Sequence, residues 1–143
     1  MNEAKKAALA AIDEKKDLIA HVADEVWDYA ELSMQEVKSA ALFVKVLKEE
    51  GFQVEEGICN IPTAFSASYG SGKPVIGFLA EYDALSGLSQ AAGSTEYHEL
   101  VKGGSGHGCG HNLLGAGAMA AAIGMKHYLE QTGCPGTVIL YGC

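Results

Sequence analysis

The segment His107-Gly-Cys-Gly-His-Asn-Leu113 carries the side chains of this chain that are best suited to chemistry. It places two imidazoles and a thiol at alternate positions, His107, Cys109 and His111, with a glycine in each gap. In an extended backbone alternate side chains point to the same side. The spacing therefore predicts that the three side chains converge on one point, as a metal site or a nucleophile–base pair requires.

Two chemistries fit these residue types. Imidazole and thiolate favour zinc or a neighbouring transition metal. Two acids, Glu81 and Asp83, would widen that choice, and Asp83 could bind the metal or orient a ligating imidazole. Alternatively, Cys109 is a nucleophile with His107 or His111 as its base, because thiols at helix N-termini ionise readily. The residues alone leave both chemistries open, as well as a packed thiol, helix-capping histidines and a solvated Asp83.

The elements around this segment predict where it lies. Apolar residues at helical spacing indicate one amphipathic helix over the first thirty or so residues and a second from about residue 36 to 50. A long loop, about residues 81 to 110, leads into an apolar helix over about 111 to 131, which is expected to be buried. A short connection, residues 70–74, is expected to join the first two of three strands as a hairpin or tight turn. These strands are predicted at Ala64–Tyr69, Pro74–Ala80 and Thr137–Gly142.

The second strand, the long helix and the third strand form a βαβ pattern, in which the two strands are expected to be parallel. Ligands of open α/β sheets bind beyond the carboxyl ends of the strands. Glu81 and Asp83 follow one strand directly, and His107–His111 immediately precedes the helix. Both groups are therefore predicted to meet at that sheet edge. The glycines at 115 and 117 lie inside the predicted helix rather than in a strand-to-helix turn, so no nucleotide cofactor is expected.

The composition limits the classes of function. The chain has 143 residues, of which 48% are hydrophobic and 20% charged, as is typical of one globular domain. A formal net charge of −8 and the lack of arginine argue against a nucleic-acid partner. With no bilayer-length apolar run and no signal peptide, we expect no membrane partner and a cytoplasmic location. The four widely spaced cysteines are expected to be reduced.

Two longer motifs resemble those of the M20 metallopeptidase family, and most closely its amidohydrolase branch. They are Gly77-Phe-Leu-Ala-Glu-Tyr-Asp-Ala-Leu-Ser-Gly-Leu-Ser-Gln90 and Gly106-His-Gly-Cys-Gly-His-Asn-Leu-Leu-Gly115. The resemblance implies an α/β fold of the zinc-peptidase (phosphorylase/hydrolase-like) type, a mixed sheet flanked by helices. It also implies a hydrolase with two divalent metal ions, manganese or zinc, in the intact active site. Its substrate would be a small N-acyl amino acid whose amide bond is cleaved.

The resemblance assigns roles to individual residues. Cys109 and His111 match the family's metal-binding cysteine and histidine, and His107 and Glu81 are further candidate ligands. Asp83 matches the acid that orients a ligand and is the candidate catalytic residue. The motif continues with asparagine where most of the branch has aspartate, and Glu81 stands where other branches have histidine. Both departures match a subgroup that acts on acyl-glutamates from folate breakdown.

The family continues beyond Cys143, where this sequence stops. A Glu-Glu pair that supplies the base and a ligand, later histidine ligands and a small dimerisation domain are all outside it. Residues 1–143 are therefore expected to be the N-terminal part of an incomplete catalytic domain, inactive alone, with an aggregation-prone edge if the last strand is unpaired. The intact protein would be a homodimer or a heteromer with a related subunit. The alternative is a non-catalytic subunit or fragment that acts only through a partner chain.

Overall fold

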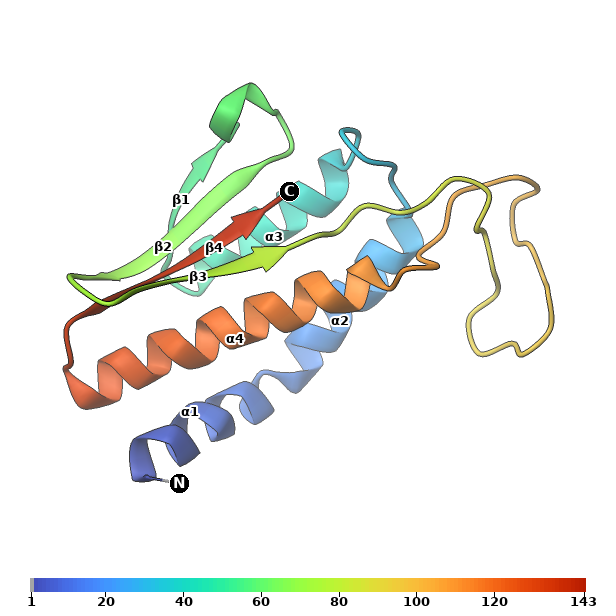
Figure 1. Ribbon diagram of the computed structural model, residues 1–143. Helices are drawn as coiled ribbons and strands as arrows, with labels where there is room; N and C mark the ends of the chain where they lie inside the picture. The colour runs from blue at the N-terminus through green and yellow to red at the C-terminus, as the bar shows by residue number, and fades with distance from the viewer. Residues whose placement is uncertain (1) are drawn as a thin grey trace.

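The computed structural model describes residues 2–143, which form a four-stranded sheet and the helices that pack on it (Figure 1). The chain begins with three helices, and its last three elements are a strand, a long helix and a strand. The elements are α1 (Glu3–Glu14), α2 (Lys16–Tyr29), α3 (Val37–Glu49), β1 (Gln53–Glu56), the short 3-10 helix η1 (Ile58–Asn60), β2 (Phe65–Ser71), β3 (Val75–Ala80), α4 (His111–Thr132) and β4 (Gly136–Gly142).

The strands form one mixed sheet in the order β1-β2-β4-β3. β4 pairs in parallel with β3, as the βαβ pattern predicts, and antiparallel with β2. Of the two forms predicted for residues 70–74, the hairpin is wrong, because β4 lies between β2 and β3, whereas the tight connection is confirmed. The last strand would have been an aggregation-prone edge only if it were unpaired, and β4 is paired on both sides. β4 is an apolar strand whose Val138 and Leu140 are fully buried, and such strands take central positions.

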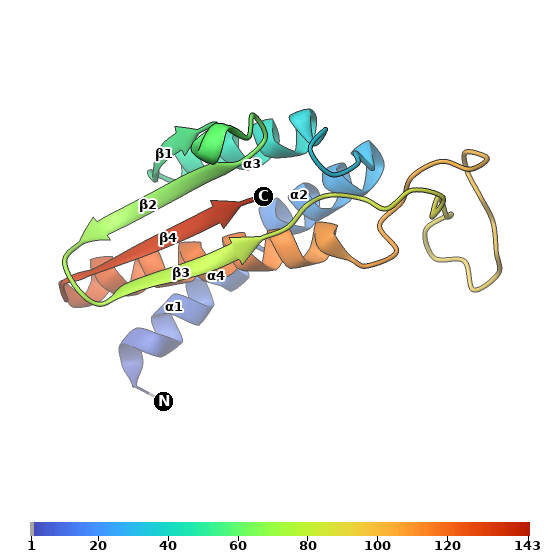
Figure 2. The ribbon, with the colours of Figure 1, turned by 45° about the horizontal axis from the view of Figure 1, so that its top comes forward.

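The helices cover one face of this sheet (Figure 2). α3 packs on β1 and β2, α4 packs mainly on β3 and β4, and α1 and α2 pack against α4. Because side chains alternate along a strand, those of Phe65, Ala67 and Leu140 point into the core between the sheet and the helices. The opposite face carries Val75 and Leu79, which are 56% and 67% exposed. Within residues 2–143, helices therefore flank the sheet on one side.

The predicted N-terminal helix is two helices, which is a correction. The chain leaves helical geometry at Lys15, with φ −96° and ψ 6°, between α1 and α2. α2 buries Val22, Ala23 and Val26, whereas none of the residues of α1 is buried. The bend lets α1 lie along α4 while α2 contributes to the core.

α4 is less buried than its apolar composition predicts. Its Met119 and Ile123 lie in the core, but Leu113 and Leu114 in the first turn are 67% and 47% exposed. No helix of residues 2–143 has the length and hydropathy needed to cross a membrane.

Candidate metal centre

The carboxyl end of β3 and the N-terminus of α4 meet at one edge of the sheet, as predicted (Figure 1). His111, the first residue of α4, lies between two carboxylates that follow β3. Its Nδ1–H donates to Asp83 Oδ1 at 2.7 Å, and its Nε2 is 2.9 Å from Glu81 Oε2. The side chains of His111 and Asp83 are 16% and 19% exposed, and that of Glu81 is 48% exposed. The sequence thus predicted correctly that these three residues come together.

Tyr82 fixes the two acids relative to the core. Its side chain is fully buried, its hydroxyl donates to the Thr63 carbonyl at 2.5 Å, and its ring packs on those of Phe43 and Phe65. Burial, with a smaller contribution from the nearby Glu36, raises the pKa of the Tyr82 phenol, so it stays a hydrogen-bond donor. Sequence analysis did not identify this residue. Its position between two acids at a strand end is the signal that would have indicated an inward-facing anchor.

Gly115 brings α4 against the segment that carries the acids. A Cβ at this position would lie 2.6 Å from the Glu81 carbonyl oxygen and 3.0 Å from Phe43 Cζ. Any larger residue would therefore push the first turn of the helix away from Glu81. Since His111 lies one turn earlier on the same helix, this close approach places its imidazole within reach of Asp83.

His107 does not join this group, which corrects the predicted convergence. Residues 107–110 form a turn, closed by a hydrogen bond from Gly110 N–H to the His107 carbonyl at 3.1 Å, so the backbone is not extended. The His107 side chain is 5% exposed and its Nε2–H donates to the Val26 carbonyl at 2.9 Å. Its ring stacks on Trp27 with a centroid distance of 6.2 Å. Burial lowers the pKa of His107 and favours the neutral imidazole.

Cys109 lies in that turn with an exposed side chain. In residues 2–143 no three side chains among histidine, cysteine, aspartate and glutamate form a group that could by itself hold a metal ion. The donor types nevertheless fit a divalent transition metal: the Nε2 of an imidazole whose other nitrogen is held by a carboxylate, a thiol two residues earlier, and a carboxylate within contact. The group therefore fits part of a metal centre, not a complete one.

Cys143 belongs to the same edge, and sequence analysis did not identify it. Its N–H donates to the Ala80 carbonyl at 3.1 Å, which places the end of β4 beside the end of β3. Burial, reinforced by the nearby Glu81 and Asp83, raises the pKa of the Cys143 thiol.

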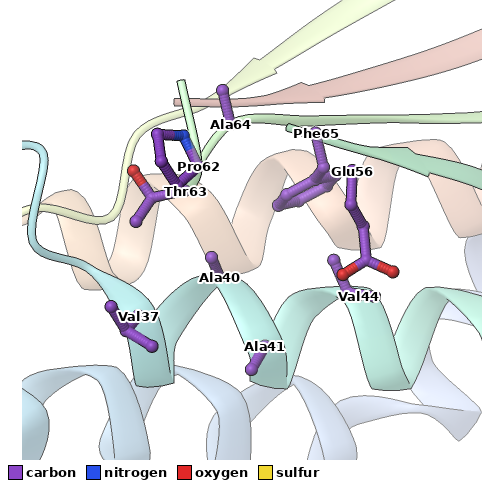
Figure 3. A pocket seen from close by; sticks show the side chains of 9 residues that line it. All are labelled: Val37, Ala40, Ala41, Val44, Glu56, Pro62, Thr63, Ala64 and Phe65. Carbon is purple, nitrogen blue, oxygen red and sulfur yellow. The ribbon is translucent and has the colours of Figure 1, made fainter. Parts of the chain in front are cut away.

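A separate pocket lies between α3 and the connection from β1 to β2 (Figure 3). Small apolar side chains form most of its wall, and its one carboxylate, Glu56, is paired with Lys48 at 2.6 Å. Among the described residues that line it, none is a candidate metal ligand. They are Val37, Ala40, Ala41, Val44, Glu56, Pro62, Thr63, Ala64 and Phe65.

The chain is similar in sequence and in structure to known proteins. The chain is 50% identical over 133 residues to one subunit of the p-aminobenzoyl-glutamate hydrolase of Escherichia coli (strain K12), an alignment that covers 93% of this chain and 28% of that protein. It also resembles a solved structure from Bacillus subtilis, described as a dinuclear metal binding peptidase from the M20 family. The TM-score is 0.62 at 25% identity, over 89% of this chain and 35% of that one. Over nearly all of its length the chain is therefore similar to a hydrolase subunit and to a peptidase of the M20 family.

Two further comparisons show weaker similarity. The chain is 27% identical to the Xaa-Arg dipeptidase of Mus musculus over 141 residues, which is 92% of this chain and 29% of the relative. The aminobenzoyl-glutamate utilization protein of Klebsiella pneumoniae, at 13% identity and a TM-score of 0.55, shares the fold over 92% of this chain and 37% of its own. No protein-family model matches the chain. The chain thus spans between 28% and 37% of the length of these relatives, and the predicted resemblance and fold class are confirmed.

Proposed function

We propose that this chain supplies metal ligands to a divalent-metal-dependent amidohydrolase that cleaves the amide bond of an N-acyl amino acid. The observation that carries the proposal is the 2.7 Å hydrogen bond between His111 Nδ1 and Asp83 at the carboxyl edge of the sheet. It leaves Nε2, which lies 2.9 Å from Glu81 Oε2, as the ring nitrogen for a metal, in a motif that also holds an exposed thiol. The 50% identity to the E. coli hydrolase makes p-aminobenzoyl-glutamate the first substrate to test.

The proposed roles follow from the positions of the side chains. His111, through Nε2, and Cys109 are the ligands, and Asp83 holds the His111 ring in the tautomer that leaves Nε2 free to bind. Glu81 is a third candidate ligand, because its carboxylate already lies 2.9 Å from that nitrogen. His107 is a poorer candidate, since its Nε2–H is committed to the Val26 carbonyl. Two divalent ions, manganese or zinc, would supply Lewis-acid polarisation of the amide carbonyl.

The domain and assembly are part of the same proposal. The chain covers 28% of its E. coli relative, and we propose that residues 1–143 are the N-terminal part of the catalytic domain. The base, further ligands and a dimerisation domain would come from outside this sequence. A homodimer, or a heteromer with a related subunit, would be the working form.

A chimera tests this proposal directly. The stretch of the E. coli hydrolase that aligns with this chain is replaced by residues 1–143, and release of glutamate from p-aminobenzoyl-glutamate is measured with Mn²⁺ or Zn²⁺ and with chelator. We expect metal-dependent hydrolysis. Cys109→Ser and His111→Gln should each lower kcat/KM at least about 100-fold, because each removes a ligand of the metal that supplies the catalysis. His98→Gln, in the exposed part of the β3–α4 loop, should leave it unchanged.

Two outcomes would contradict the proposal. A folded chimera that binds metal but does not cleave the substrate would show that this chain does not support the hydrolase site. Equal activity of the wild-type and the two ligand variants would show that Cys109 and His111 do not hold the metal. Either result would favour the alternative function, a chain that acts only by binding a partner, and co-purification with a related subunit would then be the next measurement.

A further inference from the structure

We infer that His107 and Asn112 are positioning residues that anchor the metal-binding motif to α2, so that Cys109 and His111 are held between two fixed points. The inference rests on the proposed function for the importance of that motif, but not for the geometry. Both side chains belong to the motif and both are buried, and within residues 2–143 neither forms a hydrogen bond with the carboxylates around His111.

The side chains of His107 and Asn112 both donate hydrogen bonds to backbone carbonyls of α2. His107 Nε2–H donates to the Val26 carbonyl at 2.9 Å, and Asn112 Nδ2–H donates to the Ala23 carbonyl at 3.2 Å. Residues 23 and 26 are three apart, so their carbonyls lie along the same side of α2. Val26 is fully buried and Ala23 is 4% exposed, which makes this part of α2 a rigid support.

The anchors bracket the candidate ligands in sequence. His107 precedes the turn that carries Cys109, and Asn112 follows His111 in the first turn of α4. The segment between them is short, contains two glycines that have no side chains to hold it, and forms a turn closed by the Gly110 N–H on the His107 carbonyl. Two side-chain bonds therefore attach both ends of this segment to one buried helix, and they help to set the positions of Cys109 and His111.

The energetics favour positioning over stability as the reason for these residues. Each side chain is 5% exposed, and among residues 2–143 the second polar atom of each, His107 Nδ1 and Asn112 Oδ1, has no hydrogen-bond partner. A buried polar atom without a partner costs about 1–3 kcal/mol, whereas one hydrogen bond contributes about 1 kcal/mol. An apolar side chain of similar size would fill either position at lower cost. What it could not supply is a directed bond to a carbonyl of α2.

The ring of His111 reports on this anchoring without any metal. The 143-residue chain is labelled with ¹⁵N-histidine, and long-range ¹H–¹⁵N spectra are recorded with chelator present, above the pH at which free histidine is protonated. In the wild type, His111 Nδ1 should appear as a protonated nitrogen because it donates to Asp83. Free histidine mostly carries its proton on Nε2, so loss of the contact with Asp83 gives a clear change of shift.

Two substitutions separate positioning from packing. His107→Gln keeps an N–H donor for the Val26 carbonyl, whereas His107→Phe keeps the volume and the stacking on Trp27 but donates nothing. We expect His107→Gln to retain the wild-type His111 pattern and His107→Phe to shift Nδ1 toward the unprotonated range, although the phenylalanine variant should unfold at an equal or higher temperature. His98→Gln is the matched control and should change neither quantity.

Asn112→Leu provides a second test if His107→Phe does not fold. The leucine keeps a similar volume and removes the donor to the Ala23 carbonyl, so it should shift His111 Nδ1 as well. The inference is overturned if His111 is unchanged in every donor-free variant, or if His107→Gln perturbs it as strongly as His107→Phe. Neither readout requires metal or turnover, so failure here is distinguishable from failure of the proposed hydrolase function.

Discussion

The residues at the carboxyl edge of the sheet divide into an outer side and an inner side. On the outer side, Glu81, Asp83 and His111 are partly exposed and contact one another across two elements. On the inner side, Tyr82 lies between Glu81 and Asp83 in sequence, and His107 lies four residues before His111. Both are buried, and each donates a hydrogen bond to a backbone carbonyl of another segment. The side chains that could bind a metal are thus held in place by buried side chains near them in sequence, which point into the core. Substitutions on the two sides should therefore separate loss of stability from loss of metal binding.

The largest effect is expected at Tyr82. Tyr82→Ala removes a fully buried ring from the cluster with Phe43 and Phe65 and its bond to Thr63. It should lower the free energy of unfolding by about 3–5 kcal/mol, as aromatic-to-alanine changes in cores do. Urea denaturation measures this, with Tyr97→Ala, at a residue 81% exposed, as the control. Equal losses at both positions would remove the distinction between the inner side and the surface.

A smaller effect is expected at Gly115. Gly115→Ala places a methyl group 2.6 Å from the Glu81 carbonyl oxygen, which should lower the free energy of unfolding by about 1–3 kcal/mol through overpacking. Gly117→Ala lies two residues further along α4, where an added Cβ meets nothing within 4 Å. It should instead stabilise the helix by up to about 1 kcal/mol. If both substitutions changed the free energy of unfolding in the same direction, the packing of α4 would not depend on the close contact between Gly115 and Glu81.

Acidification should affect the inner side through His107. Burial lowers its pKa and nearby His111 lowers it further, whereas the Val26 carbonyl and Asp83 act in the opposite direction. The unfolded chain protonates this histidine near its ordinary pKa of about 6.5, so just below that pH the unfolded state binds more protons than the folded state. The free energy of unfolding should therefore fall as the pH decreases through about 6.5 toward the lower pKa of the folded state.

The same measurement on His107→Gln isolates this contribution. Urea denaturation of the wild type and the variant, with chelator present, should show a smaller loss of stability for the variant between neutral and mildly acidic pH. Carboxylates titrate in both proteins and cancel in the difference. Identical pH profiles would mean that His107 is not a buried neutral group.

The smallest effect on stability is expected on the outer side, at Asp83. Asp83→Asn keeps the shape of a partly exposed side chain, so the free energy of unfolding should change by no more than about 1 kcal/mol. In the chimeric hydrolase the same change should weaken metal affinity about 10–100-fold, because the carboxylate that orients His111 is lost. Calorimetric metal titration checks this. If Asp83→Asn strongly lowered the free energy of unfolding but left metal affinity unchanged, Asp83 would behave like a residue of the inner side.

Much of the fold could be predicted from local patterns. The apolar spacing of α3 and α4, and the strand-like runs of β2, β3 and β4, matched the observed elements closely, because each period reflects which face must be buried. β1 was missed because its four residues, Gln53–Glu56, are mostly polar and exposed. The bend at Lys15 was missed because both α1 and α2 are amphipathic, and periodicity does not report a single residue outside helical geometry.

The sequence by itself determined the resemblance to M20 peptidases, the parallel pairing of β3 with β4, and the meeting of Glu81, Asp83 and His111 at one edge. These follow from strand ends and helix starts, whose places are set by local chemistry. Only the tertiary structure decided that β4 separates β2 from β3 and that His107 turns inward to α2. Both depend on contacts between residues more than sixty apart, and packing chose them because a buried strand needs two neighbours and a buried imidazole needs an acceptor.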